Sequence, residues 1–488
     1  MLTLTTLLPH QSAAVEKLRR IKTVALFMEQ GTGKTRTAIE LVAVRWGRIK
    51  RVVVFCGVSI KSMMEAEIRK HVEAPRIYVF NDTTTAANLP AADWYIIGTE
   101  STSSSNRVRL AALALVDAST MVIVDESSAI KNSTAYRTQW ITRVGEKAGW
   151  RMILNATPIT LGVVDLYAQM RFLSPLILGY RSFSAFAANH LEYHPTHKGR
   201  VVASHNVAYL AAKMAPYVYQ VTRDECLTLP GKAGFMAWTP MPDEQRALYV
   251  DVREAFLKEF DEVGSEAQND STIIYRMFSA LQQVTHGRWT QRRPWSWERN
   301  PRRTYPIEHR VDHWRLETLV ELVAKIPPAD KVVVWFGFHA DLAPILNALA
   351  PFGSASVHHG LMTPASRTAA VHAFRSGPSR FFVATPQSAG KGLTLTEASH
   401  AIFYTDTWDA ADRAHAEDRL CRIGQTREAQ IFTIACSGTI DARMRDNVVR
   451  KGRVSDAFMA RVGDIRDKRT LKQALRQLAG AIEAGEPE

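Results

Sequence analysis

Five consecutive residues near the start of the chain have the types and spacing of a phosphate-binding loop. The run Gly31-Thr32-Gly33-Lys34-Thr35 follows an apolar stretch and opens a helical pattern. Glycines let backbone N–H groups approach phosphate oxygens, lysine neutralises the β- and γ-phosphates, and a threonine hydroxyl can ligate magnesium. Met28 stands where the full eight-residue pattern has its first glycine, and the alternative is a flexible turn without a ligand. The strand–loop–helix setting favours an ATP site that uses all five residues.

A carboxylate pair follows a second apolar run, at residues 121–124. In Asp125-Glu126-Ser127-Ser128, the first two side chains come directly after the strand pattern. The carboxyl end of a parallel strand faces the crevice where ligands bind. There, Asp125 can hold magnesium and Glu126 can orient and deprotonate the attacking water. An acidic helix cap is the alternative, but downstream of a phosphate loop we predict a catalytic pair.

Two arginines far downstream supply the third part of this chemistry. Arg419 and Arg422 are three residues apart, so on a helix they would share one face and could present two guanidiniums to a γ-phosphate. The alternative is a surface helix whose arginines pair with Asp412, Glu417 and Asp418. Because one nucleotide needs all three parts, we predict an ATP site in a cleft between two lobes. One lobe would hold the phosphates and magnesium, and the other would deliver the arginines.

Two weaker patterns accompany these motifs. Gln11, which follows Pro9-His10, has an amide that can both donate to and accept from an adenine edge. Asn155-Ala156-Thr157-Pro158 follows another apolar run, and a small hydroxyl residue there can link the magnesium site to the lobe boundary. Alone, each pattern is better explained as ordinary local structure, a solvated helix start and a strand exit with a proline stop. With the other motifs present, Gln11 is a candidate nucleotide-binding residue.

The elements that must position these residues form two α/β regions. Apolar runs typical of parallel strands covered by helices on both faces occur at 23–28, 51–56, 94–99, 121–124 and 151–154. The same rhythm returns at 331–336, 380–384, 401–404 and 429–435. Mostly helical patterns lie between the two regions, at 166–172, 207–214, 244–260 and 273–284. We therefore predict domains at 1–165 (ATP-binding lobe), 166–310 (helical insertion), 311–440 (second lobe) and 441–488 (C-terminal helix and tail).

One stretch within the insertion, residues 286–310, combines arginines, tryptophans and prolines too irregularly for a long helix. Its side chains could stack on and clamp nucleic acid, with Arg292 and Arg293 as candidate contacts. Alternatively, the stretch is an irregular hinge that packs its tryptophans and leaves its arginines solvated. The sequence leaves both interpretations open.

Composition limits the class of protein. The chain has 488 residues, is 46% hydrophobic and carries a net charge of +13, which favours a polyanionic partner. Its four cysteines are scattered and form no Cys-x-x-Cys pair, which argues against a zinc site and favours a reducing compartment. Neither a signal-peptide pattern nor a long apolar run is present. We expect a soluble intracellular protein without a membrane partner.

With these residues in hand, the chain resembles the Snf family of DNA-dependent ATPases, the chromatin-remodeller-type branch of superfamily-two helicases. The most specific similarity is residues 408–425, which end in Asp418-Arg419-Leu420-Cys421-Arg422-Ile423-Gly424-Gln425. Further similarities over nearly the whole chain are residues 8–11, 29–35, 97–100, 125–128, 154–158, 229–232, 331–338 and 388–396, and Gln245 with Tyr249. His415, Cys421 and Lys391 depart from the family pattern, but no expected catalytic residue is missing.

The resemblance implies two RecA-like parallel-sheet lobes, a helical insertion and a C-terminal brace helix. It implies ATP and Mg²⁺ as cofactors and translocation along duplex DNA, without sequence preference, through contacts to the phosphate backbone. The residues it places on DNA are Thr99, Ser388, Lys391 and Thr394, and it places Gly392 on the nucleotide. A monomer is expected, in the cytoplasm of a prokaryote or a phage-infected host.

Three other functions stay open at this point. A strand-separating DNA helicase of phage replication or recombination would use the same motifs. An ATP-gated DNA-binding clamp that does not travel belongs to a different class. A P-loop kinase is disfavoured, because it would not need paired arginines in a second lobe.

Overall fold

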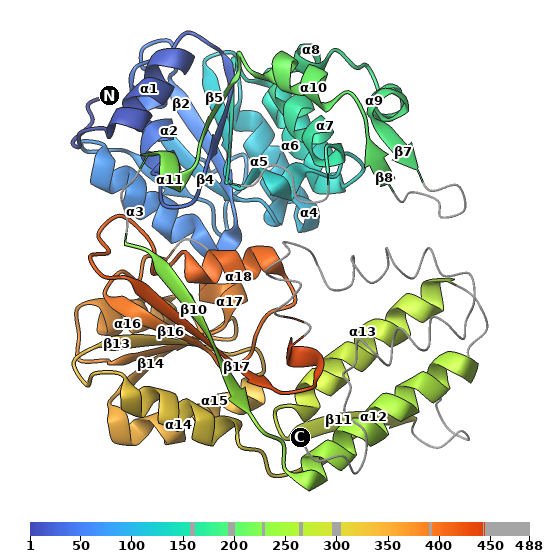
Figure 1. Ribbon diagram of the computed structural model, residues 1–488. Coiled ribbons are helices and arrows are strands. Elements are labelled where there is room, and N and C mark those ends of the chain that lie inside the picture. Colours follow the sequence, from blue (N-terminus) through green and yellow to red (C-terminus); the bar gives the residue numbers. More distant parts are fainter. Residues whose placement is uncertain are drawn as a thin grey trace. The chain divides into compact units, whose positions relative to one another are not determined.

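The computed structural model describes residues 1–156, 162–193, 201–226, 230–262, 267–294, 304–389, 393–442 and 444. The chain divides into two compact units, unit 1 (residues 1–229) and unit 2 (residues 230–488). Each unit is built around its own parallel sheet (Figure 1). None of the helices in the described ranges is long and apolar enough to cross a bilayer.

The sheet of unit 1 has seven strands in the order β3-β4-β2-β5-β6-β1-β9, and every neighbouring pair is parallel. The strands are β1 (Thr23–Met28), β2 (Arg51–Cys56), β3 (Ile77–Val79), β4 (Trp94–Gly98), β5 (Thr120–Val124), β6 (Trp150–Asn155) and β9 (Val218–Val221). All residues of β4 and β5 are buried, because helices cover both faces of the sheet. The sheet order brings the ends of β1 and β5 to the same edge, on either side of β6.

Two apolar layers hold the helices of unit 1 on opposite faces of this sheet (Figure 1). One face carries α1 (Pro9–Leu18), α2 (Lys34–Ala43) and α3 (Lys61–His71). The other carries α5 (Asn106–Leu115), α6 (Tyr136–Lys147) and α7 (Val164–Leu173). The shorter elements are α4 (Ser101–Ser104), η2 (Ser127–Ile130), α8 (Pro175–Leu178), α9 (Phe183–His190), α10 (Val207–Met214), α11 (Arg223–Cys226) and the hairpin of β7 (Leu191–Tyr193) with β8 (Val201–Ser204).

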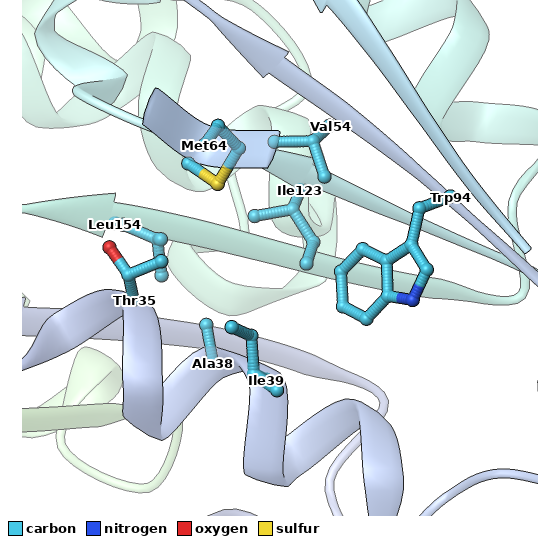
Figure 2. A pocket seen from close by; sticks show the side chains of 8 residues that line it. All are labelled: Thr35, Ala38, Ile39, Val54, Met64, Trp94, Ile123 and Leu154. Atoms are coloured by element: carbon cyan, nitrogen blue, oxygen red, sulfur yellow. The ribbon is translucent and has the colours of Figure 1, made fainter. Parts of the chain in front are cut away.

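Helix α2 rests on the sheet through a small apolar contact region. Figure 2 shows Ala38 and Ile39 of α2 facing strand side chains, with Thr35 one turn earlier on the same helix. The residues around the cavity of about 10 Å³ left between them are Thr35, Ala38, Ile39, Val54, Met64, Trp94, Ile123 and Leu154. Because this region is nearly close-packed, α2 is a firm base for the loop that precedes it.

The sheet of unit 2 has six parallel strands in the order β10-β17-β16-β13-β15-β14. The strands are β10 (Lys232–Thr239), β13 (Lys331–Trp335), β14 (Ala355–His358), β15 (Phe381–Ala384), β16 (Ala398–Phe403) and β17 (Ala429–Cys436). The helices are α12 (Asp243–Glu262), α13 (Ala267–Val284), α14 (Arg315–Lys325), α15 (Leu342–Leu349), α16 (Pro364–Arg375), α17 (Pro386–Ala389) and α18 (Ala410–Glu417). The predicted class, α/β with two parallel-sheet lobes and helices between, is confirmed.

Three features differ from the sequence-based expectation. The described residues of the stretch 286–310 are not irregular, because β11 (Arg288–Pro294) and β12 (Thr304–Arg310) pair as antiparallel strands. Two edge strands, β9 and β10, were not predicted; β10 contains Lys232, which the resemblance placed in the helical insertion. Residues 166–310 are divided between the two units rather than forming one body. Nearly all of the predicted brace helix, 441–488, lies outside the described residues.

Candidate nucleotide site

The phosphate loop of unit 1 has a backbone that only glycine accommodates easily. Gly31 and Gly33 have φ angles of 83° and 87°, the left-handed region in which a Cβ is strained. At Gly33, a Cβ would also lie 2.2 Å from Nε2 of Gln11. Gly33 is the N-cap of α2, so the left-handed turn directs the chain from β1 into the helix. The loop therefore has the strand–turn–helix form that phosphate binding requires.

Gln11 and His10 hold this loop from α1. Nε2 of Gln11 donates to the carbonyl of Thr32 at 3.0 Å, and Nε2 of His10 donates to the same oxygen at 2.8 Å. Oε1 of Gln11 accepts from the backbone N–H of Leu8 at 3.0 Å. Both side chains are buried, with 3% exposure for Gln11. The structure thus brings Gln11 to the phosphate loop; its contact with adenine stays a prediction.

Lys34 and Asp125 influence each other electrostatically at the carboxyl edge of the sheet. Burial raises the pKa of Asp125 to about 7, the charge of Glu126 adds to this rise, and the ammonium of Lys34 opposes it. Nζ of Lys34 donates to the carbonyl of Met28 at 2.9 Å. A carboxylate and a threonine hydroxyl, at Asp125 and Thr35, form an oxygen donor set of the type that magnesium prefers. The residues present therefore fit a magnesium ion.

The chain turns sharply directly after Asp125. Oδ1 of Asp125 accepts from the backbone N–H of Glu126 at 3.0 Å. Glu126 has φ 50° and ψ 61°, a left-handed conformation that is uncommon outside glycine. Such strain persists only where surrounding contacts fix it, and it clusters at functional sites. The turn supports a special role for Glu126 beyond capping a helix.

A buried hydrogen-bond chain ties the segment after Glu126 to β6 and α7. The hydroxyl of Ser127 donates to Oε1 of Gln169 at 2.6 Å and accepts from Nδ2 of Asn155 at 3.4 Å. Nε2 of Gln169 donates to the carbonyl of Asp165 at 2.7 Å. Sequence reasoning missed Gln169, although a glutamine among the apolar residues of this helix was a usable signal. Asn155 thus links its motif to the carboxylate turn, while Thr157 lies outside the described residues.

Glu29, at the start of the phosphate loop, is joined to the end of the edge strand β9. Its carboxylate accepts from the backbone N–H of Arg223 at 2.7 Å and from Nη2 of Arg223 at 3.4 Å. Lys17 of α1 donates to the carbonyl of Val218 in β9 at 2.8 Å. These contacts connect the edge strand to the elements that carry the phosphate site.

In unit 2, the two arginines do not lie on one helical face as expected. Helix α18 ends at Glu417, and Arg419 and Arg422 follow in successive turns. Arg419 is 1% exposed, and its guanidinium donates to the carbonyls of His415 at 2.7 Å and Leu393 at 3.1 Å. The prediction of a shared helix face is wrong because the helix ends at Glu417, two residues before Arg419. Arg419 is a buried bracing residue of the turn.

Arg422 differs from Arg419 in its exposure and its partners. It is half-buried, and its Nε donates to the carbonyl of Asp418 at 3.2 Å. Its Nη1 donates to the hydroxyl of Thr394 at 3.1 Å. Thr394, a predicted DNA contact, therefore lies against the arginine turn. Of the two arginines, Arg422 has the more accessible guanidinium.

The remaining candidate DNA contacts are scattered. Thr99 follows β4 and is 2% exposed, so its side chain is covered by protein. Ser388 bonds to Thr385 at 2.7 Å, within α17 and the turn before it. Arg292 and Arg293 lie on β11, opposite Pro306 and Tyr305. Their contacts with DNA stay predictions, and Lys391 and Gly392 lie outside the described residues.

Sequence reasoning also missed a buried ion-pair network before the arginine turn. Arg413 is 1% exposed, and its guanidinium pairs with Asp406 at 2.8 Å and Glu417 at 2.7 Å. Lys232 of β10 pairs with Glu417 at 2.8 Å. Asp406 lies three residues after the end of strand β16, whereas Asp125 directly follows β5. The network fixes α18 against the sheet and thereby positions the turn that follows.

Two family models match consecutive parts of the chain. The SNF2-related domain matches residues 10–288, more than half of the chain, and the helicase conserved C-terminal domain matches residues 314–424. The chain belongs to the SNF2-related family. The first match contains the phosphate loop and the carboxylate pair, and the second contains both arginines. The predicted resemblance is thus confirmed, and the chain has a helicase-like ATPase core of this family.

Curated relatives carry related names. The "Putative ATP-dependent helicase/translocase YwqA" of Bacillus subtilis is 24% identical over 346 residues, which cover 69% of this chain and 35% of that protein. The mouse "DNA annealing helicase and endonuclease ZRANB3" is 24% identical over 468 residues, 93% of this chain and 41% of that protein. The chain therefore spans 35–41% of the length of these two relatives. Among solved structures, a "Sulfolobus solfataricus SWI2/SNF2 ATPase core in complex with dsDNA" is similar at 20% identity, with 98% of each chain covered and a TM-score of 0.41.

Proposed function

We propose that this chain is a DNA-dependent ATPase that couples ATP hydrolysis to translocation along duplex DNA. The observation that carries the proposal is that the glycine-rich loop after β1, with Lys34, and the half-buried Asp125 after β5 lie at the same edge of one parallel sheet. A phosphate loop with a carboxylate at this position is the arrangement that nucleotide hydrolysis uses. Membership of the SNF2-related family supports the same reaction.

In unit 1, each side chain has a separate role in this proposal. The loop N–H groups and Lys34 bind the β- and γ-phosphates, and Gln11 orients the loop beside the base. Thr35 and Asp125 would hold magnesium, which would offset the negative charge that develops on the phosphates. Glu126, fixed in its strained turn, orients the water and accepts its proton.

In unit 2, the two arginines have different roles in this proposal, although the sequence suggested the same role for both. Arg422 supplies the guanidinium that stabilises the charge on the transferred phosphoryl group, because it is the more accessible of the two. Arg419 holds the turn through two backbone carbonyls, so we assign it positioning rather than contact with phosphate. Arg413 and its carboxylates fix the preceding helix.

The proposed partner is duplex DNA, bound mainly through its phosphates. The net charge of +13 favours a polyanion, and the names of the relatives include a helicase/translocase and a DNA annealing helicase. Contacts to phosphates carry little sequence information, so binding without sequence preference is expected.

Turnover of ATP measured without nucleic acid, and with single-stranded, duplex and forked DNA and RNA, tests the proposal. Stimulation by duplex DNA together with displacement of a triplex-forming strand supports a translocase. Stimulation without triplex displacement would indicate a stationary clamp, and unwinding of the fork would indicate a strand-separating helicase. No ATP turnover with any nucleic acid would overturn the proposed function.

A further inference from the structure

A pocket of about 510 Å³ opens between α6 and α7 of unit 1. Both helices contribute to the apolar layer on the sheet face opposite α2, so the pocket lies on the other side of the sheet from the helix that carries Lys34. The first residues of α9 and the turn before it close one end. Its volume is in the range of small-molecule sites. The nucleotide site described above does not use these residues.

Positive charge dominates the lining of this pocket. Arg143 of α6, Arg171 of α7 and Arg181 face it, against a single carboxylate, Glu146, among the described residues that line it. Within the described part of unit 1, none of these arginines forms an ion pair or hydrogen bond; Arg143 lies over the ring of Trp140 at 5.4 Å. Among the described lining residues, three guanidiniums thus face one carboxylate, which leaves an excess of positive charge. Each planar guanidinium can donate two parallel hydrogen bonds to a pair of phosphate oxygens.

A buried hydroxyl in the same pocket also has no partner. Thr138 is 3% exposed and lines the pocket, yet its Oγ1 makes no hydrogen bond to any residue in the described ranges. A helical threonine commonly bonds back to the carbonyl one turn earlier, and a buried hydroxyl without a partner is costly. Such an exception needs an explanation, and a bound ligand is one.

The pocket also has an aromatic wall. Tyr167 and Phe183 meet edge to face with 5.4 Å between ring centroids, and both line the cavity. The site therefore combines cationic and hydroxyl donors with a flat apolar surface. This combination suits an anion that is attached to a larger, partly apolar body.

We propose that the α6–α7 pocket binds a phosphate-bearing ligand, held by Arg143, Arg171 and Arg181 and by the hydroxyl of Thr138. A free polyphosphate and the backbone of a nucleic acid share this chemistry, and the experiment separates them. Binding here does not depend on the proposed ATPase activity, because the phosphate loop takes no part in it.

The test uses the full-length Lys34→Ala chain, so that pyrophosphate is not drawn to the phosphate loop. Titration calorimetry with inorganic pyrophosphate should show one saturable site. Arg171→Gln with Arg181→Gln should weaken that affinity by roughly tenfold or more, because charge-assisted hydrogen bonds are lost. Arg20→Gln with Arg48→Gln removes the same charge from exposed positions of unit 1 outside the pocket, so this control should leave the affinity unchanged.

The same three proteins are then titrated with duplex DNA at several salt concentrations. Weaker pyrophosphate binding in the pocket variant assigns the site to a free polyphosphate. Unaltered pyrophosphate behaviour, with weaker duplex binding and a salt slope smaller by about two, assigns it to a nucleic acid backbone. If neither probe distinguishes the pocket variant from the control, the proposal is overturned.

Thr138→Val provides a second variant with the same shape. Because the hydroxyl has no protein partner, its loss should leave the thermal midpoint unchanged or raise it. It should lower the affinity for whichever probe binds in the pocket by about fivefold, which is the effect of losing one hydrogen bond. A lower midpoint with unchanged affinity would assign the hydroxyl a purely structural role and remove it from the site.

Discussion

Asp125 and Asp406 both lie beyond the carboxyl end of a buried parallel strand, Asp125 directly after β5 of unit 1 and Asp406 three residues after β16 of unit 2, and their electrostatic surroundings differ. Asp406 is paired with the guanidinium of Arg413 at 2.8 Å, deep in unit 2. Asp125 has a pKa raised to about 7, because burial and Glu126 outweigh the single nearby lysine. Asp406 is neutralised by an ion pair within unit 2, whereas Asp125 can bind an added cation.

The loops that follow the central strands show the same contrast. Strand β1 leads into the phosphate loop, with its glycines and Lys34. Strand β13 of unit 2 leads into Phe336-Gly337-Phe338, which has neither lysine nor hydroxyl groups. The segment after β13 therefore lacks the residues of a phosphate loop. Similar sheets do not imply similar chemistry, because the residues after the strands decide it.

The largest expected effect tests whether unit 2 contributes to chemistry at all. Arg422→Ala should lower DNA-stimulated kcat by about 10³–10⁵, the range for an arginine that stabilises transition-state charge. ATP binding should change little, because the other phosphate contacts remain. Arg427→Ala is the control, since Arg427 pairs with Asp330 at 2.6 Å on the surface of the same unit. A kcat within a few-fold of wild type would remove Arg422 from the reaction.

Glu126→Gln should give the next largest loss and sharpen the role of unit 1. The amide keeps the shape but cannot accept a proton, so kcat should fall by about 10²–10⁴ while ATP is still bound. Single-turnover kinetics and nucleotide binding measure the two effects separately. Glu65→Gln, at a half-buried position of α3 whose carboxylate pairs with Arg69, serves as the matched control. Near-normal turnover would mean that another group activates the water.

Replacing Asp125 and Asp406 one at a time tests the difference between them directly, through the free energy of unfolding. Asp406→Asn should cost about 3–5 kcal/mol of unfolding free energy, because it breaks a buried ion pair. Asp125→Asn should preserve or raise the stability of the nucleotide-free protein at pH 8 while abolishing turnover. The folded-state pKa of Asp125 is raised, so its ionisation costs stability as pH rises from about 4 to 7.

Denaturant unfolding at pH 5 and pH 8 measures these differences. The stabilising effect of Asp125→Asn should be larger at pH 8 than at pH 5. An equal loss of stability in both variants at pH 8 would show that the two carboxylates are equivalent structural groups.

Arg419→Ala should have the smallest effect on chemistry and should act mainly on the fold. Its guanidinium supports two carbonyls, so its removal should cost roughly 2–3 kcal/mol of unfolding free energy. Turnover per folded molecule should fall much less than in Arg422→Ala. Circular dichroism melting together with active-site titration separates the two quantities. A fall in turnover as large as that of Arg422→Ala, without loss of stability, would restore the equal roles that the sequence suggested.

The sequence predicted the sheets well and their edges poorly. Strands β1 and β2 have the predicted bounds, because their runs are apolar on both faces. Strands β9 and β10 were missed, since edge strands are only partly buried and have no such pattern. The antiparallel pair of β11 with β12 was missed because cross-strand pairing, which stabilises it, leaves little trace in a local run of arginines and prolines.

The candidate site was predictable where local motifs define it. The phosphate loop and the Asp125-Glu126 turn lie where the sequence placed them. The different burial of Arg419 and Arg422 was not predictable, because it depends on where α18 ends and on the carbonyl of Leu393, far away in sequence. Gln169 was missed for the same reason, since its partner Ser127 comes from a distant element. Arg413 was missed although Asp406 and Glu417 are near it in sequence, because the pattern does not reveal that all three side chains are buried together.

The edge strands also determine how the protein bears mechanical load. The chain leaves unit 1 through β9 and enters unit 2 through β10, so tension between the units pulls on these strands. Strand β9 pairs with β1 along four residues, and β10 pairs with β17 along eight. Under tension, β9 should yield first, which optical-trap unfolding can measure. Arg223, just after β9, donates its backbone N–H to Glu29. Tension on the chain after β9 should therefore displace Glu29, next to the phosphate loop, before the strands of either sheet separate.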